Sequence, residues 1–142
     1  MSRLLQLSSA SYHVVALAIW FSIRWWQWTV FACIGMGHIS CMYHSGLPAG
    51  RLMYLTDVTY NHSIVTVSAL RTSWMWLVGA MGDNCMYDAW KYMGALAYIS
   101  VLYYGLRLRT DAFHSTIHLV SAYGIYHYAV LEHKYQMGLC WE

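Results

Sequence analysis

Formal charge is nearly absent from long stretches of this chain, and this feature limits its possible folds more than any other. Between Ala10 and Met42, Arg24 is the only residue with a formal charge. Over the whole chain 10% of residues are charged and 59% are hydrophobic, whereas a soluble domain carries roughly 25% charged residues. Too little polar surface is available to coat a water-soluble fold, so the composition predicts an all-α, polytopic integral membrane protein.

Apolar runs of helical length divide the chain. A transmembrane helix needs about 20 mostly apolar residues, and the runs predict a single domain over residues 1–142 with no soluble module. Four or five helices are expected, because the first two runs could also form one helix through Arg24 and Gln27. The expected helices cover about 10–24, 27–43, 64–81, 89–106 and 113–131. Ser45–Tyr60 contains the only proline and is expected to be a loop, and Gly82–Asp88 a short turn.

The arginines indicate an orientation. Counting the crossings places the loop with Arg51 and the loop with Arg107 and Arg109 on one side of the membrane. Cytoplasmic or matrix loops are enriched in Lys and Arg, so this side is expected to face the cytoplasm or the matrix. The first residues show no small-residue cleavage site before a hydrophobic run, so a removed signal peptide is not expected.

Cysteine spacing and net charge exclude some classes of protein. The four cysteines form no CxxC pair, and three of them lie in or beside apolar segments, so we expect buried free thiols rather than a disulfide framework. The four cysteines are Cys33, Cys41, Cys85 and Cys140. The net charge of +2 gives no reason to expect a nucleic-acid partner.

The segment Lys91–Gly105, KYMGALAYISVLYYG, combines small residues with tyrosines. Small side chains let two helices approach closely in a membrane. Gly94, Ala95 and Ala97 are therefore expected to lie at a helix–helix contact rather than against lipid.

Residues 83–104, with Asp83 ahead of the YMGALA stretch, resemble the third helix of chain 6 of NADH:ubiquinone oxidoreductase. The resemblance implies a non-catalytic helical subunit of a respiratory-chain complex in the mitochondrial inner membrane. Such a subunit contacts other membrane subunits and lipids, has no cofactor of its own, and contributes to assembly or a proton path. Its third helix can switch between α and π-bulged forms. Tyr98, Tyr103 and Tyr104 depart from the aliphatic and Phe-rich continuation of that family.

Arg71 lies in the middle of the expected span 64–81. A buried arginine in a membrane faces a protein interior or a water-filled cavity and marks function. It is expected to belong to a proton path or to pair with a carboxylate of a neighbouring subunit. Arg71 followed by Gly79 also resembles the proton-channel subunit of rotary ATP synthases, although Met75 stands where that family has an asparagine.

Histidines supply another pattern. His114 and His118 are four residues apart, which places both imidazoles on one helix face at a spacing suited to metal binding. Ser40 precedes His44 by one turn, and Asp57 follows. This order resembles the alkaline ceramidase-like zinc hydrolases of membranes. The resemblance implies that His44, His114 and His118 hold zinc and that Ser40 and Asp57 assist. Those enzymes use seven helices, however, and the chain between Asp57 and His114 has room for two.

Two other roles for the histidines stay open. They could form interhelical hydrogen bonds, or ligate a haem between helices, with His38 or His44 opposite His118 or His127. Because four or five helices have little room to enclose Arg71 and several histidines, the sequence favours a subunit of a respiratory-type complex that is not an enzyme by itself. The zinc-dependent lipid hydrolase is the alternative.

Overall fold

The computed structural model describes residues 3–23, 28–45, 50–105 and 110–141, and this part of the chain contains helices and turns but no strand. The all-α prediction is thereby confirmed. The elements are α1 (Arg3–Ser9), α2 (Ser11–Ile23), α3 (Trp28–His44), α4 (Gly50–Leu77), α5 (Asp83–Ser100), the π-helix η1 (Val101–Gly105), α6 (Asp111–Gln136) and the 3-10 helix η2 (Leu139–Trp141).

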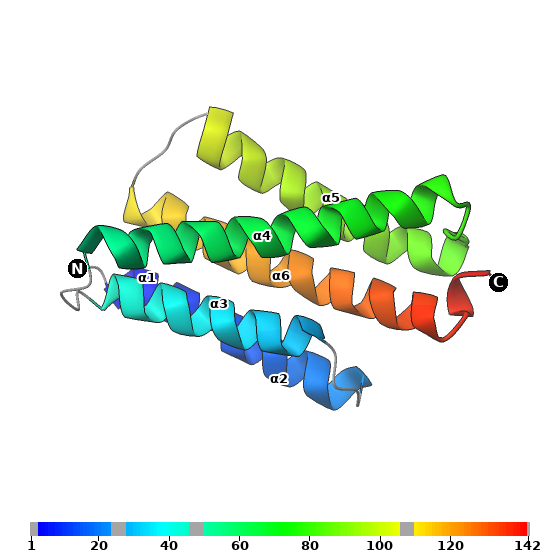
Figure 1. Ribbon diagram of the computed structural model, residues 1–142, viewed down its shortest axis with the longest axis horizontal. Coiled ribbons are helices and arrows are strands. Elements are labelled where there is room, and N and C mark those ends of the chain that lie inside the picture. Colours follow the sequence, from blue (N-terminus) through cyan, green and yellow to red (C-terminus); the bar gives the residue numbers. More distant parts are fainter. Residues whose placement is uncertain (1–2, 24–27, 46–49, 106–109, 142) are drawn as a thin grey trace.

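The helices form an elongated bundle around α6 (Figure 1). α6 packs against α1, α2 and α5, while α3 packs against α2 and α4 packs mainly against α3. The end of α3 and the beginnings of α4 and α6 lie at one end of the bundle, next to α1. The C-terminus and the α4–α5 turn lie at the opposite end. We refer to these as the α1 end and the C-terminal end.

The first apolar block forms two separate helices, α2 and α3, which pack against each other. Arg24 and Gln27, at the expected boundary, lie outside the described residues. Arg107 and Arg109, on which the expected orientation partly depended, also lie outside them, whereas Arg51 lies in the first turn of α4.

The expected loop over Ser45–Tyr60 was wrong from Gly50 onward, because α4 begins there and continues to Leu77. The polar residues that suggested a loop satisfy their side chains on their own helix. Thr56 Oγ1 donates to Leu52 O at 2.9 Å, and Ser63 Oγ donates to Thr59 O at 2.8 Å. Such bonds to the carbonyl four residues earlier keep hydroxyl side chains compatible with a helix.

The expected turn over Gly82–Asp88 was also wrong in extent, since α5 begins at Asp83, whose acidic side chain suits a helix N-terminus. The preceding helix ends in a Schellman motif. Gly79 has a φ of 71°, Ala80 N donates to Met75 O at 2.9 Å, and Gly79 N donates to Trp76 O at 3.0 Å. The left-handed conformation explains a glycine at this position.

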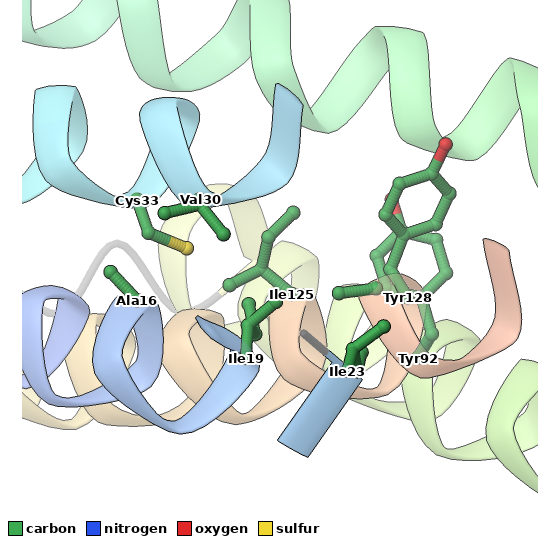
Figure 2. Packing of buried hydrophobic residues seen from close by; sticks show 9 residues of the cluster. Ala16, Ile19, Ile23, Val30, Cys33, Tyr92, Ile125 and Tyr128 are labelled. Carbon is green, nitrogen blue, oxygen red and sulfur yellow. The ribbon is translucent and has the colours of Figure 1, made fainter. Parts of the chain in front are cut away.

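The largest apolar cluster joins α2, α3, α5 and α6 (Figure 2). Ile19 and Cys33 are fully buried in it, next to Ile125 of α6. The rings of Tyr92 and Tyr128 contact each other in a tilted arrangement, with centroids 5.3 Å apart and planes inclined at 50°. The Tyr92 hydroxyl lies 2.5 Å from Ser68 Oγ and so joins α5 to α4.

The closest approach of α5 to α6 occurs at Ala95 and Gly124. Ala95 is buried, and a Cβ atom built on Gly124 would lie 2.9 Å from the Ala95 Cβ. Gly94 and Ala97 are exposed, and nothing lies within 4 Å of a Cβ built on Gly94. Within the described chain, Ala95 makes a helix–helix contact, and the contacts expected for Gly94 and Ala97 stay a prediction.

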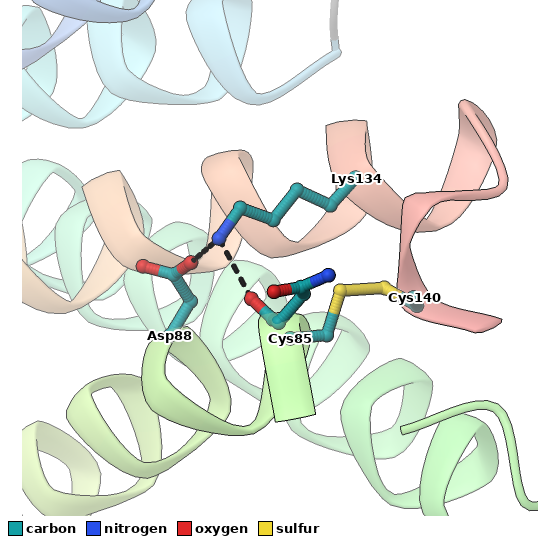
Figure 3. Close-up of a disulfide and its surroundings, with 5 residues drawn as sticks. Cys85, Asp88, Lys134 and Cys140 are labelled. Atoms are coloured by element: carbon teal, nitrogen blue, oxygen red, sulfur yellow. Dashed lines mark hydrogen bonds and ion pairs between the residues drawn. A yellow bond between two sulfur atoms is a disulfide. The ribbon is translucent and has the colours of Figure 1, made fainter. Parts of the chain in front are cut away.

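A disulfide joins Cys85 of α5 to Cys140 of η2 (Figure 3). The expectation of free thiols was wrong for this pair, while Cys33 and Cys41 are free. The tail after α6 folds back onto the start of α5, where Gly82 N donates to Cys140 O at 2.7 Å. This long-range contact brings together two cysteines that are 55 residues apart.

Among the described residues, one helical stretch is long and apolar enough to cross a membrane by length and composition, Arg3–Ile23 near the N-terminus. A single stretch of this kind is also typical of a buried core helix or of a signal sequence. The topology of four or five membrane spans therefore stays a prediction.

Replacing Gly124 with valine should destabilise the bundle, because its side chain would be forced into Ala95. We expect a loss of about 1–3 kcal/mol of unfolding free energy, the usual cost of overpacking. Thermal unfolding of the purified protein measures it. Gly94→Val is the matched control, since that side chain would enter open space. Equal stability of the two variants would contradict the α5–α6 contact.

The disulfide should contribute about 2–4 kcal/mol, as is typical for native cross-links. Cys140→Ser and chemical reduction of the wild-type protein are expected to lower its stability by similar amounts. Cys41→Ser, at a free and partly buried thiol, serves as the control. A wild-type protein whose unfolding did not respond to reductant would argue against the cross-link.

Candidate metal centre

Three histidines converge at the α1 end of the bundle. His44 is the last residue of α3, and His114 and His118 lie on consecutive turns of α6. One ring nitrogen from each lies within 4.8 Å of those of the other two. The ring centroids of His114 and His118 are 4.7 Å apart, and that of His44 lies 5.0 and 5.3 Å from them.

α6 positions two of these histidines through its own local sequence. Thr110 is the N-cap and its side chain accepts a hydrogen bond from Phe113 N at 3.5 Å, while Asp111 supplies negative charge to the first turn. The helix therefore starts one turn before His114. The spacing of four residues then places His118 on the same face, as the sequence predicted.

The His44 ring has an unsatisfied polar atom. Its Nε2 is buried and has no hydrogen-bond partner among the described residues. His44 is the last residue of α3 and is 3% exposed. Neutral imidazole is the form in which histidine binds metal. A buried polar atom without a partner is costly unless a ligand completes it.

Ser40 and Asp57 meet beside the histidines. Ser40 Oγ donates to Asp57 Oδ1 at 2.5 Å, from α3 to α4. Asn61, one turn further along α4, donates to the same oxygen at 3.0 Å. Ser40 and Asp57 are both buried. The two bonds fix one side of the carboxylate.

A cavity of about 160 Å³ lies between α4, α5 and α6, and Asp57, His114 and His118 are among the residues that line it. Its remaining wall is mainly apolar and aromatic, including Tyr12 and Met36. The π-helix η1 contributes Tyr103 and Tyr104 to this wall. The cavity thus brings Asp57 and two of the three histidines together with a mainly apolar lining.

Sequence reasoning missed three further residues of this site. Ser8 Oγ and Ser9 Oγ lie 3.0 and 3.1 Å from His118 Nδ1, and Asn61 holds Asp57. Asn61 could have been found from its i+4 spacing if Ser45–Tyr60 had been predicted as a helix. Nothing in the local sequence pattern indicated the two serines.

Arg71 has a partner within its own chain. Its Nε and Nη2 each donate to a carboxylate oxygen of Glu132 at 3.4 Å, and Tyr128 donates to the same carboxylate at 3.3 Å. The guanidinium lies over the rings of Trp74 and Tyr135, 5.0 and 4.9 Å from their centroids. Within the described chain the carboxylate that pairs with Arg71 comes from α6. The expected pairing with a neighbouring subunit, like the proton path, stays a prediction.

The other histidines considered for haem ligation lie apart from this cluster. His38 Nδ1 is 3.3 Å from His13 Nε2 on the exposed surface of α2 and α3. His127 Nδ1 is 2.7 Å from Asp88 Oδ1, toward the C-terminal end, where Lys134 also pairs with Asp88. His44 with His118 is the one expected haem pairing whose rings the structure brings together.

The donor set fits zinc. Catalytic zinc sites use three protein ligands and keep a fourth position open, and three histidines are one established set. His44, His114 and His118 would supply these ligands, with the orphaned Nε2 of His44 among them. Histidine ligands of zinc also have their second ring nitrogen hydrogen-bonded, as His118 has.

Comparison with known proteins identifies no relative: no family model matches the chain, and neither a curated protein nor a solved structure matches it.

Added zinc should stabilise the purified protein. Free Zn²⁺ at about 100 times its dissociation constant should add about 2.7 kcal/mol of unfolding free energy, and metal analysis should give one zinc per chain. His118→Ala removes one ligand and should abolish both effects. His133→Ala, near the other end of α6, should retain them. Zinc retained in full by His118→Ala would contradict the three-histidine site.

Proposed function

We propose that this protein is a zinc-dependent membrane hydrolase that cleaves an amide or ester bond of a lipid. One observation carries the proposal. Three histidines from two helices converge beside a buried serine–aspartate pair, and Asp57, His114 and His118 of this group line a mainly apolar cavity. The alkaline ceramidase-like pattern in the sequence had selected the same five residues.

When bound, zinc supplies a Lewis acid that polarises a carbonyl and lowers the pKa of water. Asp57 is the base of the proposal, because its carboxylate lies at the cavity and can accept a proton from water. Ser40 and Asn61 hold the carboxylate on one oxygen, which orients it. Positioned general bases typically contribute 10²–10⁴-fold to a rate.

The cavity supports a lipid as substrate. Its lining combines aliphatic side chains from α5 and α6, such as Leu96, Ile99 and Ile117, with the histidines and Asp57. An acyl chain would fit against the apolar wall and place its carbonyl carbon near the polar group of residues. Binding sites for small molecules usually have this composition.

Exposed apolar side chains support a location in the membrane. Each of the six α-helices presents large apolar residues on the outside of the bundle, and such surfaces mark contact with lipid or with other proteins. Examples, in helix order, are Leu7, Phe21, Ile34, Leu77, Trp90 and Leu119, between 42% and 86% exposed.

Membership of a respiratory complex remains a prediction with less support from the site. Its main argument was that Arg71 and the mid-span histidines need partners from other subunits. Glu132 supplies that partner for Arg71, and the three histidines are directed toward one another. The other alternative, a proton-channel subunit of a rotary ATP synthase, also depended on Arg71, whose guanidinium pairs with Glu132 of its own chain.

Hydrolysis of a long-chain fatty-acyl amide in detergent micelles tests the proposal. Asp57→Asn should retain zinc but lower the rate by about 10²–10⁴-fold, because the amide cannot act as a base. His118→Ala should lose both zinc and activity. Asp83→Asn, at the exposed start of α5, is the control and should keep the wild-type rate. A zinc-loaded wild-type protein that cleaved neither acyl amides nor acyl esters would refute the hydrolase.

A further inference from the structure

Ser8 and Ser9, at the end of α1, contact the same ring nitrogen of a metal ligand. Their Oγ atoms lie 3.0 and 3.1 Å from Nδ1 of His118, 110 and 109 residues away. Both serines are buried, 5% and 0% exposed. Either a hydroxyl or the imidazole could supply the proton in each of these contacts.

The protons of the serines are directed elsewhere. Each hydroxyl has a single proton, and Ser8 Oγ and Ser9 Oγ donate to Leu5 O at 3.0 and 2.8 Å. Their oxygens are therefore left as acceptors toward His118. With the serine protons directed to Leu5 O, the proton in both contacts comes from Nδ1 of the imidazole.

In a neutral imidazole one nitrogen carries the proton and the other carries a lone pair. With the proton on Nδ1, the lone pair of His118 is on Nε2. We infer that Ser8 and Ser9 are positioning residues that hold His118 in the tautomer whose Nε2 can bind the metal. This inference rests on the proposed zinc function of the three histidines.

α1 is also bonded to the helix that carries His44. Gln6 Nε2 donates to the carbonyl oxygen of His44 at 3.2 Å, and Cys41 Sγ donates to Gln6 O at 3.7 Å. The short helix thus contacts both ligand-bearing helices, α3 through Gln6 and α6 through its serines. These hydrogen bonds hold the ring of His118 and the backbone of His44 in fixed positions relative to each other.

The tautomer of His118 can be measured without metal. Ring ¹⁵N and ¹³C chemical shifts of histidine-labelled protein distinguish Nδ1–H from Nε2–H, and a His118→Gln sample assigns the signals. The wild-type protein should show Nδ1–H. Ser8→Ala combined with Ser9→Ala should lose this preference, because both acceptors are removed. Ser68→Ala removes a buried serine that also donates to its own helix, and should leave His118 unchanged.

Zinc affinity gives the second readout. The double variant should bind Zn²⁺ roughly 10–100-fold more weakly, the usual effect of losing a partner behind a metal ligand, while Ser68→Ala should bind as the wild type does. Affinity of the double variant within twofold of wild type, or a wild-type His118 in the Nε2–H form, would overturn the inference.

The tautomer of His118 in the wild-type protein tests the inference even if the double variant does not fold. The two hypotheses also fail separately. A wild-type protein with His118 as Nδ1–H that bound no Zn²⁺ would refute the proposed function and leave the role of the serines in setting the tautomer intact. A protein that bound Zn²⁺ through an Nε2–H form of His118 would refute the role of the serines and leave the proposed function intact.

Discussion

The structure depends on one constraint: polar groups buried in an apolar bundle must find hydrogen-bond or ion-pair partners inside it. Each unpaired polar group costs several kcal/mol in an apolar medium. Toward the C-terminal end this condition is met. Glu132 pairs with Arg71, and Asp88 pairs with both His127 and Lys134. At the α1 end the condition is not met, since His44 Nε2, Asn61 Oδ1 and Ser115 Oγ have no partner among the described residues. This contrast, more than the number of histidines, distinguishes a candidate site from structural polar contacts.

One helix supports both the core and the site. α6 contributes Ile125 and Tyr128 to the main apolar cluster, Gly124 to the contact with α5, and Glu132 to the pairing with Arg71. The same helix presents His114 and His118 at its beginning. Because one rigid element joins these features, the geometry of the histidines depends on how closely α5 and α1 pack against α6.

Local patterns in the sequence predicted the parts of this structure that depend on local spacing. Helical length and the i, i+4 relation of His114 and His118 were visible directly, whereas the meeting of Ser40 and Asp57 was suggested only through a family resemblance. Contacts between distant segments were not predictable, because nothing in the sequence near Arg71 identifies Glu132, 61 residues later. The pairing of Cys85 with Cys140 was not predicted for the same reason. The start of α4 was not predicted because Pro48 and the polar residues after it favour a loop. The hydroxyls of that stretch instead bond to carbonyls of their own helix.

The position of the disulfide has a consequence for cellular chemistry. Disulfides persist in oxidising compartments and are rare where glutathione keeps thiols reduced. Cys85 and Cys140 lie at the end of the bundle opposite the histidines, so a bundle that crossed a membrane would expose its two ends to different redox conditions. The histidines, with Arg51 at the same end, would then lie near the reducing side. Zinc would have to be acquired there in competition with abundant cellular thiols, and the affinity of the site would have to match the free zinc of that compartment.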